Sequence, residues 1–328
     1  MITIKRLNKA DLQAFVESAA FSQLPFLPIS RHRAISHIRN PRASEGDTLL
    51  LLAYHEDQLV GYLGVLPDWI FDDQGNKHTC GWLSCMWIDV SQRGKGISKK
   101  LVREALDAYD RKILVTEFTY PAQRLYDKLG AFKDLQKIEG MRLYIRSDFA
   151  KLLPPKGPRF ARLVGLWKRL DKLANLFLDL RFRFGRGTWG STISYHEEIN
   201  QEIMQFMATA KTTELLRRDQ SALNWILFHP WIKEQSTADE ESKKYHFSSI
   251  AKRFQFVPVT LSDDGGKTVA FLMFAIRDHH LKIPYCYFDE SAEKEVKTCI
   301  AHHLIKWRIS TCTFFHPALV RLFTNGHY

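Results

Sequence analysis

The stretch WIDVSQRGKGISKKLV, residues 87–102, joins a β-rich run to a helix through two closely spaced glycines. Gly94 and Gly96 can adopt backbone conformations that other residues avoid, which allows a tight turn and a close approach to a ligand. The helix that follows offers free N–H groups and the positive end of its dipole at the same point. Arg93 and Lys95 add positive charge. The stretch therefore predicts a strand, a loop and a helix that together hold an anion such as phosphate.

Two widespread phosphate loops do not fit this stretch. A P-loop requires Gly-x-x-x-x-Gly-Lys-Ser/Thr, which is absent from the sequence. A dinucleotide-binding loop would place a third glycine at Lys99 and would follow the first strand of its domain. From the glycines alone, a tight strand-to-helix turn without a ligand stays open as an alternative.

The first half of the chain alternates β-rich runs with amphipathic helices. Residues 47–68 hold two apolar runs around a polar turn at 55–58, which predicts a hairpin. Residues 98–112 place apolar side chains at helical spacing, which predicts a helix with one buried face. The other expected elements are a strand and a helix in 3–21, a helix in 24–44, strands in 81–90 and 113–118, a helix in 121–131, and two last strands in 132–146.

After residue 147 the composition changes. A proline-rich break leads into a basic amphipathic helix that ends in alternating Arg and Phe. Two interpretations stay open: a helix that packs on the flanking domains, or a helix that lies on an anionic membrane surface. We expect a domain at 1–147, a linker helix at 148–190 and a second domain at 191–328.

The order of the first half returns after this linker. Residues 254–278 repeat the strand, acidic turn and strand of 48–68, and KIPYCYFD and the helix after it repeat LSCMWID and its helix. This pattern suggests an internal duplication of one α/β unit. The loop differs, because ESAEKEV at 290–296 contains no glycine and brings three carboxylates. We therefore expect one phosphate-binding loop in the chain.

These motifs together resemble the GNAT acyltransferase superfamily, over roughly residues 1–147. Arg93 to Ser98 occupy the positions of the family's Arg-x-x-Gly-x-Gly/Ala loop, with Ser98 where glycine or alanine is usual. The segment AQRLYDKLGAF resembles the family's later motif, and Thr119 stands where asparagine is frequent. The resemblance implies an α/β (α+β) fold with a mixed, mostly antiparallel sheet flanked by helices, duplicated in a tandem arrangement with a degenerate C-terminal copy. The later motif is matched by Ala122, Tyr126, Gly130 and Phe132.

The resemblance also implies a site. The loop would bind the pyrophosphate of acetyl-CoA or another acyl-CoA, and the thioester would lie where the strand ending at Ile88 splays from residues 113–118. The N–H near Ile88 would polarise the thioester carbonyl, and Tyr126 would protonate the departing thiolate. Glu117 and Asp89 are the candidate general bases, with ion pairing or capping as the alternative for each. The expected cofactor contacts are Ile88, Asp89, Val90, Arg93, Gly94, Lys95, Gly96, Ile97, Ser98, Thr119 and Ala122.

Composition narrows the partners further. The formal net charge of +11 suits an anionic partner, such as a nucleotide cofactor or a membrane surface, without selecting one. Five cysteines without a Cys-x-x-Cys pair argue against a disulfide framework and a zinc site. No apolar run approaches the length of a membrane span, and the first residues do not resemble a signal peptide. We expect a cytoplasmic protein that binds no metal and no nucleic acid.

The functional hypothesis is an N-acyltransferase, most simply an N-acetyltransferase, in which an amine attacks acyl-CoA directly. The acceptor is a small-molecule, glycan or peptide amine, and the second domain shapes its site. Two alternatives stay open: a transferase similar to the peptidoglycan-bridge family that uses aminoacyl-tRNA, and a CoA-binding module without catalysis. His229, Trp225 and Trp231 are candidates to line the acceptor pocket, with core packing as the simpler interpretation.

Overall fold

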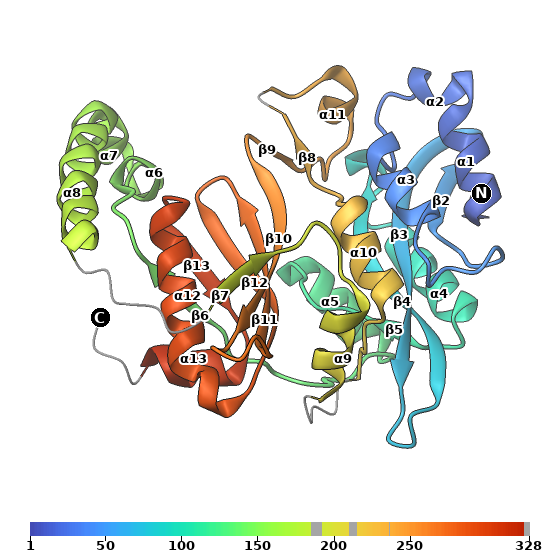
Figure 1. Cartoon of the computed structure of the whole chain (residues 1–328). Helices are drawn as coiled ribbons and strands as arrows, with labels where there is room; N and C mark the ends of the chain where they lie inside the picture. Colours follow the sequence, from blue (N-terminus) through green and yellow to red (C-terminus); the bar gives the residue numbers. More distant parts are fainter. Residues whose placement is uncertain (185–191, 210–214, 236, 325–328) are drawn as a thin grey trace. The chain divides into compact units, whose positions relative to one another are not determined.

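The computed structural model describes residues 1–184, 192–209, 215–235 and 237–324 (Figure 1). The chain forms two compact units, each composed of two separate segments of the sequence. The first unit contains Met1–Gln136 with Thr212–Ala251, and the second contains Lys137–Lys211 with Lys252–Tyr328. No helix in the described part of the chain is long and apolar enough to cross a membrane.

The first unit is built on a five-stranded sheet of order β1-β2-β3-β4-β5. All neighbouring strands pair antiparallel except β4 and β5, which pair parallel. This mixed, mostly antiparallel sheet flanked by helices confirms the expected fold class. Its elements are β1 (Ile2–Leu7), α1 (Lys9–Glu17), α2 (Ala19–Gln23), α3 (Arg31–Ile38), β2 (Leu50–His55), β3 (Gln58–Phe71), β4 (Lys77–Ile88), the 3₁₀ turn η1 (Val90–Gln92), α4 (Ile97–Ala108), β5 (Ile113–Leu114) and α5 (Tyr120–Leu129).

Two apolar cores lie on this sheet. In one, α4 and α5 pack with Leu51, Leu63 and Val65, which are fully buried. In the other, α1 to α3 pack with Leu50, Leu52 and neighbouring residues of the strands. Successive side chains of a strand point to opposite faces, so adjacent residues of β2 enter different cores. The expected alternation of strands and amphipathic helices is thereby confirmed.

A segment from the second half of the sequence packs on the first unit. It carries α10 (Gln220–Phe228), β8 (Lys233–Glu234), α11 (Glu240–Lys244) and β9 (Ile250–Ala251). The buried Asp68 carboxylate of β3 lies 2.6 Å from both Arg42 and Arg218. The Trp225 indole N–H donates to the Ser36 carbonyl of α3 at 2.8 Å, and the Leu27 N–H donates to the Lys244 carbonyl at 3.0 Å. Polar bonds to the first sheet and to α3 therefore fix this segment.

The second unit repeats the same order around a six-stranded sheet, β6-β13-β12-β11-β10-β7. Its strands pair antiparallel except β12 and β13, which pair parallel. Its elements are β6 (Met141–Tyr144), α6 (Phe149–Leu152), the 3₁₀ turn η2 (Pro154–Lys156), α7 (Pro158–Arg162), α8 (Val164–Phe184), β7 (Thr192–Tyr195), α9 (Gln201–Thr209), β10 (Phe254–Ser262), β11 (Thr268–Arg277), β12 (His280–Phe288), the 3₁₀ turn η3 (Glu290–Ala292), α12 (Glu293–Lys306), β13 (Thr311–Phe314) and α13 (Pro317–Thr324).

The compact units differ from the expected boundaries at 147 and 191. The run 132–146 does not complete the first sheet with two strands. It contributes one strand, β6, which pairs with β13 in the second sheet, since the backbone of 141–144 finds its hydrogen bonds there. Residues 215–251, which the sequence predicted in the second domain, belong to the first unit, because the polar contacts given above hold them there.

Helix α8 lies within the expected linker at 148–190 and packs with α6 and α7 in the second unit (Figure 1). The Asp171 carboxylate accepts hydrogen bonds from the Phe149 and Ala150 N–H groups at 2.7 and 2.9 Å, which ties α8 to α6. Residues 185–190 lie outside the described residues. The apolar ridge of α8 is exposed at Leu166, Leu170, Leu173, Phe177 and Leu180, by 47%, 38%, 65%, 71% and 45%.

Candidate functional site

The loop between β4 and α4 has the geometry that anion binding requires. Gly94 and Gly96 have φ of +82° and +76°, in the left-handed region that favours glycine. A Cβ atom at either position would meet no atom within 4 Å, so the space beside both residues is open. Gly96 is the N-cap of α4 and supplies no side-chain cap, so the first N–H groups of this helix are directed toward that open loop. The sequence prediction of a glycine loop at a helix N-terminus is confirmed.

The basic side chains of the loop are exposed and bonded only locally. Arg93 Nε donates to the Ile88 carbonyl at 3.3 Å, and Lys95 Nζ donates to the Gln92 side chain at 2.8 Å. Ile97 is buried in the core under α4, whereas Ser98 is half-buried. Neither Arg93 nor Lys95 forms an ion pair with the described residues, so both charges are available to an anion.

The strand before the loop separates from its parallel neighbour. β4 and β5 pair only at Gly81 with Ile113 and at Trp82 with Leu114. Residues 115–118, which the sequence placed in the same strand, are not assigned to β5. The Asp89 N–H donates to the Val60 carbonyl at 2.9 Å. Because alternate residues direct their N–H groups to opposite edges, the N–H of Ile88 points to the edge that β5 leaves open.

Tyr126 lies on α5 beside this core. Its side chain is buried against the rings of Phe118 and Phe132, whose centroids lie 5.9 and 4.8 Å from its own. Burial raises the pKa of the Tyr126 hydroxyl. A tyrosine with a raised pKa keeps its proton at neutral pH, which is the state that a general acid needs.

The two candidate bases differ in their surroundings. The Asp89 carboxylate accepts hydrogen bonds from the Ser91 hydroxyl and N–H at 2.6 and 2.8 Å, and these bonds lower the Asp89 pKa. It caps η1, which makes it a weak base. Glu117 is exposed in the segment after β5. Thr119 is the N-cap of α5 and makes no capping bond with its side chain, and Ala122 lies half-buried in the first turns of that helix.

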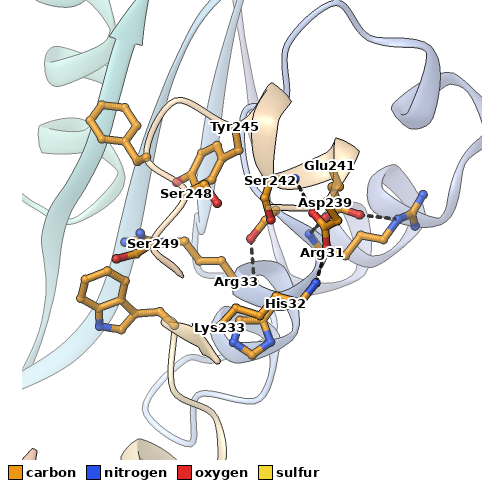
Figure 2. Close-up of a pocket in the computed structure, with 13 residues that line it drawn as sticks. Arg31, His32, Arg33, Lys233, Asp239, Glu241, Ser242, Tyr245, Ser248 and Ser249 are labelled. Carbon is orange, nitrogen blue, oxygen red and sulfur yellow. Dashed lines mark hydrogen bonds and ion pairs between the residues drawn. The ribbon is translucent and has the colours of Figure 1, made fainter. Parts of the chain in front are cut away.

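A cavity of about 260 Å³ opens within the first unit between the start of α3 and residues 231–249 (Figure 2). Trp231 lines it, whereas Trp225 and His229 instead bond to Ser36 of α3, the latter through its carbonyl. Its walls are both charged and aromatic, formed by Ser30, Arg31, His32, Arg33, Trp231, Lys233, Asp239, Glu241, Ser242, Tyr245, Phe247, Ser248 and Ser249.

Beside this cavity is an aromatic cluster composed of Phe26, Tyr62, Trp87, Tyr245, His246 and Phe247. The His246 ring stacks on Trp87 with centroids 4.2 Å apart and planes 20° apart. Trp87 directly precedes Ile88, the last residue of β4, so His246 lies at the end of the strand from which the glycine loop begins. His246 is not among the residues predicted from the sequence, because no motif links residue 246 to residue 87. Only the packing of 215–251 on the first unit brings them together.

Comparison with known proteins gives a family match for part of the first unit. Residues 14–131 match the model of the acetyltransferase (GNAT) family. The loop of Arg93 to Ser98 lies within the matched residues.

Two curated relatives are 31% identical over 98 residues: a probable spermine N(1)-acetyltransferase of Bacillus subtilis subsp. natto (strain BEST195), and a spermine/spermidine N(1)-acetyltransferase of Bacillus subtilis (strain 168). The match covers 29% of this chain and 55% of each relative, so the chain spans about half the length of the curated relatives it matches.

A solved structure of a protein of unknown function from Enterococcus faecalis V583, described as a probable N-acyltransferase, covers 96% of this chain and 65% of its own. Its identity is 13% and its TM-score 0.53, a similarity of fold alone.

Proposed function

We propose that the first unit transfers an acyl group from acyl-CoA to an amine by direct attack. The observation that carries the proposal is the open glycine loop at the N-terminus of α4, next to the point where β4 separates from β5. Helix N-termini with free N–H groups bind phosphate, and the splayed strands leave room for an extended thioester arm. Acetyl-CoA, or a longer acyl-CoA, would supply the acyl group.

Different residues of the first unit bind the cofactor, stabilise the developing charge and transfer protons. Arg93, Gly94, Lys95, Gly96, Ile97 and Ser98 hold the pyrophosphate, with Val90, Thr119 and Ala122 beside the rest of the cofactor. The N–H of Ile88 donates to the thioester carbonyl oxygen, where negative charge develops. Tyr126 protonates the leaving thiolate. Asp89 caps the loop, and Glu117 remains a base only for an acceptor that reaches its exposed segment.

The loop is tested by placing a side chain at Gly96. Gly96→Val forces a β-branched residue to φ near +76° and fills the open space, so acyl-CoA affinity should fall at least tenfold. Gly75→Val is the matched control, because Gly75 has φ of +84° with open space around it, in the turn between β3 and β4. Calorimetric titration with acetyl-CoA and longer acyl-CoAs measures both. Unchanged affinity in Gly96→Val would reduce the loop to a turn.

The second unit is proposed to be a copy that has lost the cofactor loop. Its helix α12 begins after Ala292, and Glu293 and Glu295 lie in its first turn. Carboxylates at this position repel a phosphate. One acyl-CoA per chain is the expected stoichiometry. The glycine loop of the first unit also disfavours an aminoacyl-tRNA donor, since such a donor would not need it. Turnover of any amine would exclude a binding module without catalysis.

The acceptor is proposed to be a small-molecule amine. The curated relatives are named as acetyltransferases of spermine or spermidine, which makes polyamines one candidate class beside glycan, peptide and other small-molecule amines. A panel of amines assayed by mass spectrometry for acylated product separates these classes.

The exposed ridge of α8 supports a second proposal, contact with an anionic membrane surface. Arg169 and Lys172 flank the ridge, and Asp171 on the other side is used by α6. An apolar stripe beside basic side chains suits anionic lipid. Co-sedimentation with vesicles of anionic and of neutral phospholipid tests it. Binding to the anionic vesicles should be lost in Leu173→Glu, and equal binding to neutral vesicles contradicts the proposal.

A further inference from the structure

The two faces of β4 near its end pack against different helices. Met86 and Ile88 pack toward the core of α4, the helix that begins at the glycine loop. Cys85 and Trp87 pack toward the core of α1 to α3. If acyl-CoA binds on the α4 side, as proposed above, an amine reaches the thioester from the face of Trp87. The cavity and the aromatic cluster lie on that face.

In the described part of the chain, one cation that lines the cavity has no anionic partner. Lys233 pairs with Asp239 at 2.5 Å. The Glu241 carboxylate accepts a hydrogen bond from the backbone N–H of Arg31 at 2.6 Å and lies 3.5 Å from the Arg31 guanidinium (Figure 2). Arg33 forms no ion pair with the described residues, and its guanidinium lies 5.3 Å from the centre of the Trp231 ring.

A second polar group beside Arg33 also lacks a partner. His32 Nε2 is buried and has no hydrogen-bond partner among the described residues. A guanidinium offers two parallel N–H donors, which match a carboxylate or a phosphate. The cavity is therefore suited to a small anionic group.

The cavity adjoins the reacting end of β4 through rings. Tyr245 and Phe247 line it, and both contact Tyr62, at 6.2 and 6.3 Å between centroids. Tyr62 in turn stacks on Trp87 at 6.0 Å. Tyr62 itself is fully buried, whereas Phe247 is 37% exposed and directly follows His246 in the sequence. A small acceptor anchored in the cavity can thus extend along Phe247 toward the thioester.

His246 stands at the other end of this path. It is exposed, it stacks on Trp87, and it contacts the Phe26 ring at 5.9 Å. Burial lowers its pKa, against an opposing effect of Asp89, and Arg93 acts in turn on Asp89. A neutral imidazole at neutral pH can accept a proton from an ammonium group.

We propose that this face of the first unit is the acceptor site, in which Arg33 binds an anionic group of the amine substrate and His246 takes its proton. The acceptor is then an amine that also carries a carboxylate or a phosphate. The ammonium gives one proton to His246, and the amine lone pair forms the C–N bond as the C–S bond breaks. Tyr126 protonates the sulfur and recovers the second nitrogen proton through solvent. The products are an amide, the CoA thiol and one proton on His246.

Acceptor pairs that differ by one anionic group test the role of Arg33. Lysine is compared with cadaverine, and phosphoethanolamine with ethanolamine. The anionic member of at least one pair should have a kcat/KM about 10- to 100-fold higher, and Arg33→Gln should remove that preference without changing acyl-CoA affinity. The two pairs separate carboxylate from phosphate. Arg39→Gln, an exposed change at the end of α3, is the control. A preference for the diamine overturns the proposal.

A binding measurement tests, without turnover, whether Arg33 binds an anion in the cavity. Trp231 lies beneath Arg33, so its fluorescence reports occupancy of the cavity. Acetate or inorganic phosphate should give a saturable change that is lost in Arg33→Gln and in Trp231→Phe. The absence of a saturable change with both anions overturns the proposal. Because the signal must be lost in both variants, phosphate that binds at the glycine loop does not count, and the result is independent of acyl-CoA binding.

His246→Gln tests the proton acceptor. We expect kcat to fall about 10²-fold, with the acyl-CoA dissociation constant unchanged. In the wild type, kcat/KM should decline as the pH falls below the lowered pKa of His246, and this acidic limb should disappear in the variant. His55→Gln, a half-buried histidine of β2, is the control. Wild-type kcat with an unchanged acidic limb in His246→Gln would refute the assignment.

Discussion

At the end of β4 the Asp89 N–H donates to the Val60 carbonyl at 2.9 Å, and at the end of β12 the Asp289 N–H donates to the Val269 carbonyl at 3.0 Å. A short 3₁₀ turn and a helix follow in each case. The loops then differ: Gly94 and Gly96 take positive φ before α4, whereas the residues before α12 include no glycine. The same order of strand, 3₁₀ turn and helix therefore carries an open glycine loop in the first unit and an acidic turn without glycine in the second.

The units also differ in how their strands separate. β4 and β5 pair at two positions, whereas β12 and β13 pair at four. The first unit leaves more of its central strand edge free, and it alone receives residues 215–251. The open loop, the open strand edge and the added segment 215–251 therefore occur in the same unit. Four changes test this difference, in order of expected effect.

The added segment should depend on Asp68. Although burial raises the pKa of this carboxyl, the charges and hydrogen bonds of Arg218 and Arg42 hold it below its usual value. Asp68→Ala removes the carboxylate that lies 2.6 Å from the buried Arg42 and leaves it Asp219 at 3.8 Å, which should cost the first unit about 3–5 kcal/mol of unfolding free energy. Asp72→Ala, at an exposed aspartate in the turn of the same hairpin, should cost much less unfolding free energy, because solvent screens its charge. Chemical denaturation measures both, and similar losses would mean that the buried charges do not anchor the segment.

Acid should destabilise the second unit through His303. Burial lowers the His303 pKa to about 4. Because the folded pKa is below the unfolded value near 6.5, the stabilising contribution is complete above pH 6.5. It is lost as pH falls toward 4, by about 3 kcal/mol.

Thermal unfolding between pH 7.5 and 5 tests the role of His303. His303→Gln should have a lower melting temperature at pH 7.5 but a smaller fall on acidification. An equal fall would assign the effect elsewhere, with His37 of the first unit as the alternative, because burial lowers its pKa to about 3.

Tyr126 marks a third difference between the units. Pro121-Ala122 and Pro317-Ala318 occur near the starts of α5 and α13, and five residues after each proline stand Tyr126 and Leu322. Tyr126→Phe keeps the ring packing and removes the hydroxyl, so kcat should fall about 10²-fold while acyl-CoA affinity is kept. Steady-state kinetics and titration measure these separately. Tyr54→Phe is the control, and an unchanged kcat would remove Tyr126 from the chemistry.

The smallest effect is expected in the second unit. The double change Glu293→Gln and Glu295→Gln removes negative charge from the first turn of α12, which should cost about 0.3–1 kcal/mol through the helix dipole. It should not create a second acyl-CoA site, since no glycine is gained. Titration should still give one acyl-CoA per chain, and a stoichiometry of two would show that charge alone closed the second loop.

Much of the fold could be predicted because it is encoded locally. The glycine loop, the hairpin of β2 and β3 and the amphipathic α4 each depend on residues close in sequence. The predictions of strands were wrong where the backbone hydrogen bonds join residues that are far apart in the sequence. Residues 141–144 could equally have completed the first sheet, and only their pairing with β13 placed them in the second. The segment 113–118 was predicted as one strand, but only Ile113 and Leu114 find a partner.

The sequence by itself determined the glycine loop, the repeated order of elements and the absence of glycine from the second loop, because positive φ and helical periodicity are properties of short stretches. Tertiary structure alone decided that residues 215–251 join the first unit. It also decided that His246 lies on Trp87 and that Arg33 faces a cavity in which no described residue forms an ion pair with it. These contacts depend on buried polar bonds between residues far apart in the chain, such as Asp68 with Arg218, and no local pattern specifies such partners.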